Sequence, residues 1–427
     1  MVADHLTGPL VSPSVPPATV GPQTFRHRGS HPIDRCAEGG RLSEGATMTI
    51  RYGFLSTHPP TRCGLAAFNS ALAAHLAEVA GPSGIVRVAV NGDDVTPAAG
   101  VAHTWVDTTP AGWRDSAEVL NTFDVAVVQH EYGIYPGRDG GEVLSVLRRL
   151  TVPSIVVLHT VLTHPTPRQK SLLEQIVAAA GAVVAITEAA HDRLLLGYAV
   201  DPAKVCVIPH GASDFAGEPA RRYDDRPHLL TWGLLGPGKG IEWALRALAR
   251  LQSVKPAPVY TVAGRTHPKV VEQHGEAYRA SLHQLGAALG IAHDVHYESA
   301  YLDDAALGDL IRSADVVVLP YDSTEQVTSG VLVEAVAAGI PVVATAFPHA
   351  VELLTDGPGL LVPHRNPAAL AAAVRKILTK PALAAELRTR GGHAEPVLRW
   401  PAVAQRYQEL ATTVIGARAR PVAVAGA

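Results

Sequence analysis

Residues 315–345, DVVVLPYDSTEQVTSGVLVEAVAAGIPVVAT, decide the fold of this chain. The segment starts with a valine-rich apolar run, passes through a polar turn into a helical stretch, and ends in a second apolar run. Continuous apolar runs are typical of strands buried on both faces of a parallel sheet, and an intervening helix completes a βαβ unit. The segment therefore predicts part of a parallel α/β sheet.

The same alternation continues along most of the chain. In the first half we predict strands at 50–56, 85–90, 125–129, 154–159, 183–186 and 205–208, with helices at 65–79, 141–150, 168–180 and 188–197. In the second half we predict strands at 229–232, 259–263, 295–298, 316–320 and 342–345, with helices at 241–251, 275–289, 304–313 and 329–338.

The polar, aperiodic stretch 216–226 between the halves is a predicted linker. We predict a disordered extension at 1–47, with Met48 a candidate start, and two Rossmann-like domains at 48–215 and 227–395. A crossover helix and tail then occupy 396–427. Trp400 and Tyr407, seven residues apart, share one face of that helix, which must pack against another element.

Composition narrows the function classes. A chain of 427 residues with 47% hydrophobic and 18% charged residues suits a soluble protein of two domains. A net charge of −3 argues against nucleic acid as a partner. No apolar run is long enough to span a bilayer, and the N-terminus does not resemble a signal peptide, so we expect a cytoplasmic protein, with peripheral membrane contact left open. The three scattered cysteines lack the spacing of a zinc site or disulfide framework.

The polar turn of 315–345 is the first candidate site. Ser329 and Gly330 open a helix whose free amides, that of Val331 included, suit an anion such as a diphosphate. Parallel sheets bind ligands at this end of their strands. The alternative is that Ser329 is an ordinary helix cap and that Glu334, one turn on, merely complements the helix dipole.

This segment resembles the C-terminal signature of family 4 glycosyltransferases of the GT-B fold, an E-x7-E pattern followed by A-x-x-x-G-x-P-V-V-A-T. The resemblance implies that Glu334 holds the ribose of a nucleotide-sugar donor. The first glutamate of the pattern would contact the sugar hydroxyls. Gln326 occupies its place and Glu325 lies one residue out of register, so either residue is a candidate for that role.

Residues 229–240, LLTWGLLGPGKG, predict a strand that runs into a glycine-rich turn. Gly233 and Gly238 allow close approach of the backbone to phosphate, and Lys239 supplies a positive charge. The turn resembles the family's G-R-x-x-x-x-K-G motif, but Leu234 replaces the arginine, whose charge Arg265 is a candidate to supply. Two alternatives are an ordinary tight turn and a P-loop, although Gly240 lacks the hydroxyl that a P-loop uses to bind magnesium.

The first half contributes weaker signals. The loop 54–66, FLSTHPPTRCGLA, resembles the family's first loop, with Gly64 and Arg62 near donor or acceptor. His159 ends a predicted strand where the family places a histidine against the transferred sugar. His130 and Glu131, in VVQHEYG, are either donor or acceptor contacts or a structural pair. We interpret His210 and Gly211, in VIPHG, as structural.

The resemblance implies an α/β fold of two Rossmann-like, doubly wound parallel-sheet domains facing a cleft. It implies a metal-independent, retaining hexosyltransferase that uses mannose or glucose from a nucleotide-sugar donor and needs no separate cofactor. His159, Lys239 and Gln326 would act in catalysis, and the acceptor would be a saccharide, a lipid-linked or a small molecule. Two alternatives are a UDP-sugar epimerase of related fold and a non-catalytic nucleotide- or carbohydrate-binding protein.

Overall fold

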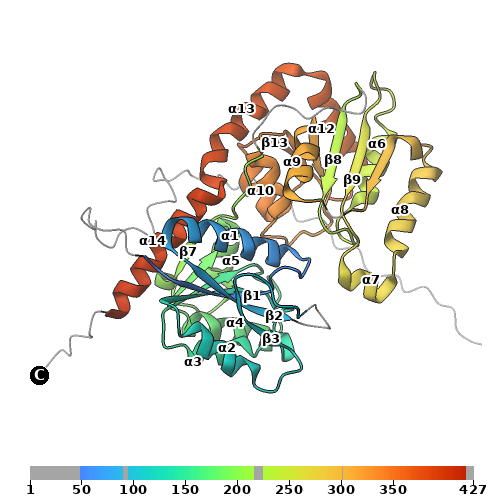
Figure 1. The fold of residues 1–427 in the computed structure, drawn as a ribbon. Helices are drawn as coiled ribbons and strands as arrows, with labels where there is room; N and C mark the ends of the chain where they lie inside the picture. Colours follow the sequence, from blue (N-terminus) through green and yellow to red (C-terminus); the bar gives the residue numbers. More distant parts are fainter. Residues whose placement is uncertain (1–48, 90–94, 216–224, 301, 420–427) are drawn as a thin grey trace, which may run out of the picture. The chain divides into compact units, whose positions relative to one another are not determined.

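The structure is a computed structural model that describes residues 49–89, 95–215, 225–300 and 302–419. The predicted extension 1–47 and Met48 lie outside the described residues, as does all but the last two residues of the predicted linker 216–226. In the described part of the chain, the strands form two parallel sheets with helices on their faces (Figure 1).

Seven of the described strands form the first sheet, in the order β3-β2-β1-β4-β5-β6-β7, and every pairing is parallel. The strands are β1 (Tyr52–Ser56), β2 (Ser83–Ala89), β3 (Val101–Val106), β4 (Val125–His130), β5 (Ser154–Leu158), β6 (Ala182–Ala185) and β7 (Val205–Val207). The connecting helices are α1 (Gly64–Ala80), α2 (Gly112–Leu120), α3 (Val143–Arg149), α4 (Pro167–Ala179) and α5 (Glu188–Gly197), with short 3-10 turns η2 (Arg138–Gly140) and η3 (Pro202–Lys204).

Six further described strands form the second sheet, in the order β10-β9-β8-β11-β12-β13, again with parallel pairings. The strands are β8 (His228–Trp232), β9 (Val259–Ala263), β10 (Val295–Glu298), β11 (Val316–Leu319), β12 (Val342–Thr345) and β13 (Gly359–Val362). The helices are α6 (Ile241–Ala249), α7 (Pro268–His274), α8 (Ala277–Ala288), α9 (Asp304–Arg312), α10 (Gly330–Ala337), α11 (Pro348–Leu354), α12 (Pro367–Thr379) and α13 (Pro381–Leu398), with the 3-10 turn η4 (Ala292–Asp294).

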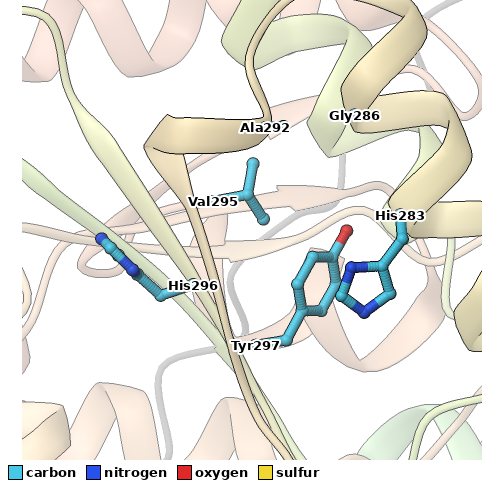
Figure 2. Close-up of a pocket in the computed structure, with 6 residues that line it drawn as sticks. All are labelled: His283, Gly286, Ala292, Val295, His296 and Tyr297. Atoms are coloured by element: carbon cyan, nitrogen blue, oxygen red, sulfur yellow. The ribbon is translucent and has the colours of Figure 1, made fainter.

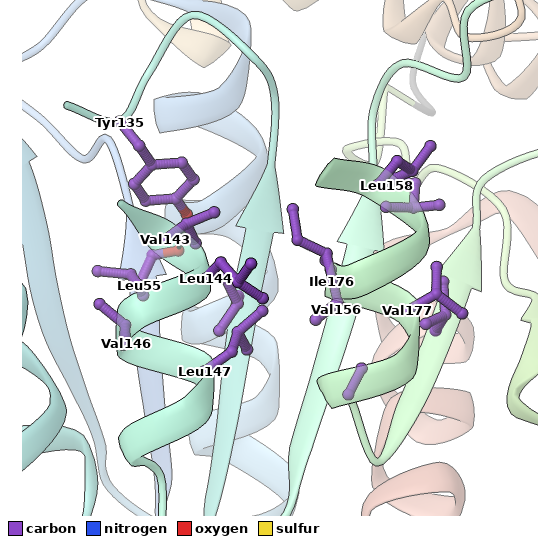
Figure 3. Packing of buried hydrophobic residues seen from close by; sticks show 14 of the residues in the cluster. Leu55, Tyr135, Val143, Leu144, Val146, Leu147, Val156, Leu158, Ile176 and Val177 are labelled. Carbon is purple, nitrogen blue, oxygen red and sulfur yellow. Dashed lines mark hydrogen bonds between the residues drawn. The ribbon is translucent and has the colours of Figure 1, made fainter. Parts of the chain in front are cut away.

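The apolar runs of the sequence become the buried strands of these sheets. Figure 3 shows one face of the first sheet, where Leu55 of β1 and Val156 of β5 lie among leucine, isoleucine and valine side chains of α3 and α4. Both residues are fully buried. Helices cover both faces of each sheet, so the strands carry few polar residues, and the fold class predicted from the sequence is confirmed.

The last described helix, α14 (Trp400–Ala419), packs against the first sheet together with α1. Trp400 and Tyr407 are 4% and 0% exposed and belong to the same apolar cluster as Phe68 of α1. The seven-residue spacing therefore predicted the buried face of this helix correctly. None of the helices in the described residues is long and apolar enough to cross a bilayer.

Candidate functional site

Strands β8 and β11 lie side by side in the second sheet, and the chain leaves them in opposite directions. After β8 it continues to β9 on one side, and after β11 it continues to β12 on the other. In open parallel sheets, ligands bind beyond the carboxyl ends of the strands at such a reversal point. The predicted glycine turn follows β8 and the predicted helix start follows β11, so the topology brings both segments to one edge of the sheet.

The glycine turn after β8 lies directly against the segment that follows β11. The amide of Asp322 donates a hydrogen bond to the carbonyl of Gly238 at 2.9 Å. A Cβ atom on Gly240, whose φ is 66°, would stand 1.9 Å from the carbonyl oxygen of Pro320, so only glycine fits this approach. The ammonium of Lys239 lies 4.3 Å from the centre of the Tyr321 ring.

Gly238 differs from Gly240 in its surroundings. Its φ is 93°, a backbone conformation that favours glycine, but a Cβ atom there would meet nothing within 4 Å. Open space beside Gly238 and a half-buried lysine at the next position are the features that an oxyanion site needs. Arg265, the candidate replacement for the arginine missing at Leu234, is exposed, and its carbonyl accepts a hydrogen bond from the amide of Leu235.

Helix α10 begins at Gly330, with Ser329 as its N-cap. The Ser329 hydroxyl accepts a hydrogen bond from the amide of Leu332 at 3.3 Å. The amide of Ser329 itself donates a hydrogen bond to Nδ1 of His349 at 2.9 Å. One of the three amides predicted to bind the diphosphate is therefore already hydrogen-bonded to an imidazole. Gly330 and Val331 lie in the first turn, where helical amides have no acceptor within the helix.

Glu334 links α10 to the end of β8. Its carboxylate accepts a hydrogen bond from Nε1 of Trp232, the last residue of β8, at 2.9 Å. Burial raises the pKa of Glu334 to about 7, and the Trp232 hydrogen bond and the nearby Asp304 modify this shift in opposite directions. A Cβ atom on Gly233 would lie 3.3 Å from a methyl group of Val331, so the turn and the helix start are in close contact.

We expect Glu334→Gln to stabilise the free protein, and to do so more at pH 8 than at pH 5. The folded protein keeps the Glu334 proton up to about pH 7, whereas the unfolded carboxyl group loses it near the ordinary value of 4.5. Ionisation in the folded state therefore costs stability as the pH rises between these values, and glutamine avoids this cost. The expected gain is about 1 to 3 kcal/mol at pH 8, measured by urea denaturation at both pH values.

The exposed Glu78 of α1 provides the control, because Glu78→Gln removes a carboxylate that solvent already surrounds. A gain for Glu334→Gln that does not change between pH 5 and pH 8 contradicts the assigned pKa shift.

Both candidates for the first glutamate of the E-x7-E pattern have partners. The Gln326 side chain donates from Nε2 to the carbonyl of Thr328 at 2.9 Å. The Glu325 carboxylate accepts a hydrogen bond from the hydroxyl of Thr163 and lies 3.6 Å from Nη2 of Arg193. Gln326 therefore shapes the loop before α10, whereas Glu325 contacts residues of the first half of the chain.

The first sheet has its own reversal point between β1 and β4. The loop after β1 leads to Gly64, the exposed first residue of α1, where an added Cβ atom would meet nothing within 4 Å. Cys63 caps this helix, because its Sγ accepts a hydrogen bond from the amide of Ala66 at 3.4 Å. Arg62 is exposed beside it.

Three predicted residues lie at the ends of β4 and β5. His130 is buried, and burial lowers its pKa to about 4. Glu131 accepts hydrogen bonds from the Thr160 hydroxyl and from the amide of Tyr132, and burial raises its pKa despite the opposing charge of Lys269.

His159 is half-buried, and Nε2 of its ring lies 2.8 Å from Oε1 of Gln129. Burial and, to a smaller extent, the neighbouring His210 and His130 lower the pKa of His159 to about 3, so the ring is neutral.

The structure adds three residues that the sequence did not assign to the site. His349 accepts from Ser329 as described, and burial lowers its pKa to about 3. Nε2 of His210 lies so close to Gly330 that an added Cβ atom would stand 2.9 Å from it. Nζ of Lys269 would similarly stand 3.0 Å from a Cβ atom on Gly133. A lone histidine or lysine carries no spacing signal, so the sequence did not identify His349 and Lys269, whereas His210 was interpreted as structural.

A hollow of about 340 Å³ lies elsewhere, beside the edge strand β10. In Figure 2 the rings of His283 and Tyr297 pack together, with centroids 4.0 Å apart, whereas His296 points away from them. The polar groups that line this hollow do not converge on one point, so the reversal point between β8 and β11 is the better candidate site.

Comparison with known proteins identifies the family to which the chain belongs. Residues 214–393 match the family model of glycosyl transferases group 1, and residues 79–214 match that of glycosyltransferase family 4. D-inositol 3-phosphate glycosyltransferase of Kineococcus radiotolerans is 32% identical over 270 residues, which cover 58% of this chain and 60% of the relative. The enzyme of the same name from Geodermatophilus obscurus is 33% identical over 262 residues, which cover 54% of this chain and 55% of the relative. The chain thus matches about 60% or less of the length of these two relatives.

Solved structures share the fold at low sequence identity. HepE from Anabaena in complex with UDP and glucose has a TM-score of 0.67 at 16% identity, covering 85% of this chain and all of that one. Sucrose-phosphate synthase from Thermosynechococcus elongatus has a TM-score of 0.67 at 18% identity, covering 86% of this chain and all of that one. The two family models together match well over half of the sequence, and the chain belongs to the group 1 glycosyltransferases of the GT-B fold.

Proposed function

We propose that this protein transfers a hexose from a nucleoside-diphosphate sugar to a hydroxyl group of an acceptor, with retention of the anomeric configuration. The proposal rests mainly on the meeting of the Lys239 turn and the start of α10 at the reversal point of the second sheet. An ammonium group on a turn that packs against a helix start with free amides suits the two negative charges of a departing nucleoside diphosphate. Family membership supports the reaction class.

Each residue then has a definite task in the proposed reaction. Lys239 and the amides of Gly330 and Val331 stabilise the charge that develops on the leaving diphosphate. Glu334 accepts hydrogen bonds from the ribose, and Trp232 orients its carboxylate. His159, neutral at physiological pH, contacts a hydroxyl group of the transferred sugar. Gln326 supports the loop through which the sugar is held.

Donor and acceptor are inferred from the relatives alone. Structures of the same fold contain UDP with glucose, and the matched relatives are named for D-inositol 3-phosphate. We therefore propose UDP-glucose as the first donor to test and a polyol phosphate as the first acceptor, with GDP-mannose as the second donor. The proposed reaction needs no divalent metal, although Glu188, His191 and Asp192 form a described group with ligand atoms within 4.8 Å of one another.

A thermal-shift screen against UDP, GDP and ADP and their sugars tests donor binding. A ligand present at 100 times its Kd stabilises the native state by about 2.7 kcal/mol and raises Tm accordingly. We expect one nucleoside diphosphate to raise Tm. We also expect the enzyme to release that diphosphate from its sugar only when an acceptor is present, and to do so without added metal. Sugar altered without an acceptor indicates an epimerase, binding without turnover indicates a binding protein, and loss of turnover in EDTA contradicts the metal-free mechanism.

A further inference from the structure

A line of polar side chains runs through the interior of the first domain and ends at His159. Nε2 of His159 lies 2.8 Å from Oε1 of Gln129, and Nε2 of Gln129 lies 3.5 Å from Oδ1 of Asn69. Nδ2 of Asn69 lies 3.3 Å from Nδ1 of His58, in the loop that follows β1. The line thus joins the residue that follows β5 to β4, α1 and the first loop.

The two amides at the centre of this line are fully buried. Gln129 and Asn69 both have 0% exposure, and Gln129 interrupts the valine run of β4. A buried amide costs stability unless it is hydrogen-bonded, and apolar residues of similar shape would fill these positions without that cost. The pair therefore needs an explanation beyond packing.

The hydrogen bonds along this line are mutually dependent. An amide oxygen only accepts and an amide nitrogen only donates, so the orientation of one amide fixes the orientation of the next. If Oε1 of Gln129 faces His159, then His159 carries its proton on Nε2, and Nδ1 of His58 must be the acceptor from Asn69. Reversing the line would place the proton of His159 on Nδ1 instead.

We propose that Gln129 and Asn69 are positioning residues that hold the proton of His159 on Nε2 and leave Nδ1 free to accept a hydrogen bond from the transferred sugar. The proposal rests on the proposed function, which places His159 against that sugar. The tautomer that a ring nitrogen adopts is set by the hydrogen bond made at the other nitrogen. The sugar hydroxyl would then meet a fixed acceptor rather than a mixture of donor and acceptor.

The surroundings keep both ends of the line neutral. Burial and the neighbouring His210 and His130 lower the pKa of His159 to about 3. Burial and the charge of Arg87 lower the pKa of His58. The edge of the Phe68 ring packs against His159 with centroids 4.8 Å apart, which restrains the ring further. The ring of His159 therefore stays uncharged near neutral pH, and its tautomer is the property left to control.

Histidine-selective ¹⁵N NMR tests the tautomer directly, with His159→Phe and His58→Phe used to assign the ring signals. In the wild-type protein we expect Nε2 of His159 to be protonated and Nδ1 to be unprotonated from pH 5 to pH 8. Gln129→Met keeps the shape of the side chain but removes both hydrogen bonds, and it should give a mixture of tautomers. Asn69→Leu should have the same effect to a smaller degree, because it frees the Gln129 amide to rotate.

Calorimetry tests whether the tautomer matters for the sugar. The ligands are the nucleotide sugar that stabilises the wild type most and its nucleoside diphosphate alone. Gln129→Met should bind the nucleotide sugar about tenfold more weakly and the diphosphate with unchanged affinity. Ser116→Ala is the matched control, because it removes another fully buried hydrogen bond in the same domain, from the Ser116 hydroxyl to the Gly112 carbonyl.

The outcomes separate this proposal from the proposed function. Protonated Nδ1 in the wild type, a single tautomer retained in Gln129→Met, or a tautomer mixture without loss of sugar affinity each overturns the positioning role. Equal loss of affinity for the diphosphate and its sugar also overturns it, because a general disturbance then explains the result. If the wild type binds no nucleotide sugar, the proposed function fails and the positioning role for the sugar fails with it, while the spectra still show whether the hydrogen-bonded line sets the tautomer.

Discussion

We expect Lys239→Ala to lower turnover at saturating donor by about 100- to 1,000-fold while the protein stays folded. The ammonium of Lys239 lies at the reversal point of the second sheet, over the ring of Tyr321, where the diphosphate is proposed to leave. Removal of one fixed donor to a developing negative charge typically costs that much in rate. The charge grows mainly as the sugar bond breaks, so kcat should fall more than the affinity for the donor.

Stability should change little in this variant. Lys239 is half-buried, and its contact with Tyr321 is a cation–π contact worth about 0.5 to 2 kcal/mol. The matched control is Lys376→Ala, which removes one exposed positive charge from α12 of the same domain. Initial-rate kinetics with the donor found by the thermal-shift screen measure the effect. Turnover of Lys239→Ala within threefold of Lys376→Ala contradicts the assigned role.

The strands that determine where the site lies could be predicted because they are buried on both faces. Strands β9 and β12, which are buried along their whole length, have the bounds expected from the sequence, and so does α5. The edge strands β3 and β13 were missed. In β3 only Trp105 is buried, so the continuous apolar run that marks a central strand is absent. In β13 the short stretch Gly359–Val362 is half-buried at its centre and gives equally little signal.

Several helices were also missed, α2 and α7 for identifiable local reasons. Helix α2 starts after Ala111, which has a φ of 56° and forms no side-chain cap, so the usual start signal is absent. Helix α7 (Pro268–His274) is separated from α8 only by Gly275 and Glu276. We expect a single helix at 275–289 from the sequence, whereas the structure has one helix on each side of this break.

The candidate site was predictable only where its residues belong to one local motif. Gly238, Lys239 and Glu334 lie in segments whose strand-turn-helix order already indicates a ligand. The contact of His349 with Ser329 joins the starts of α11 and α10, and no spacing in the sequence reports it. For the same reason the sequence could not show that Glu325 already has a partner, because Thr163 lies far from Glu325 along the chain.

The second large effect is expected from Trp400→Ala, which should lower the free energy of unfolding by about 3 to 5 kcal/mol. Trp400 begins α14 and is 4% exposed. Its ring packs against the rings of Phe68 and His210, with centroids 5.1 and 5.6 Å away, and against Gly211, where an added Cβ atom would stand 2.2 Å from it. Truncation of a buried tryptophan to alanine leaves a cavity that well-packed neighbours cannot fill, which explains the size of the loss.

The chain is hydrogen-bonded beside this ring, so the cavity cannot close by a simple shift of the helix. The amide of Ala212 donates to the carbonyl of Leu398 at 2.7 Å, and the amide of Trp400 donates to the carbonyl of Ala212 at 3.2 Å. Urea denaturation measures the loss, with Leu196→Ala as the control, because Leu196 is 89% exposed and its truncation should cost less than about 0.5 kcal/mol. A loss below 1 kcal/mol for Trp400→Ala contradicts this packing.

The same variant also links the last helix to the candidate site. His210, which loses its packing against Trp400, lies against Gly330 at the start of α10. A His210 ring that gains freedom should loosen the helix start whose amides are proposed to hold the diphosphate. We therefore expect Trp400→Ala to weaken nucleoside diphosphate binding even under conditions where the variant is fully folded, and calorimetry beside Leu196→Ala measures this. Unchanged affinity would show that α14 stabilises the fold without supporting the site.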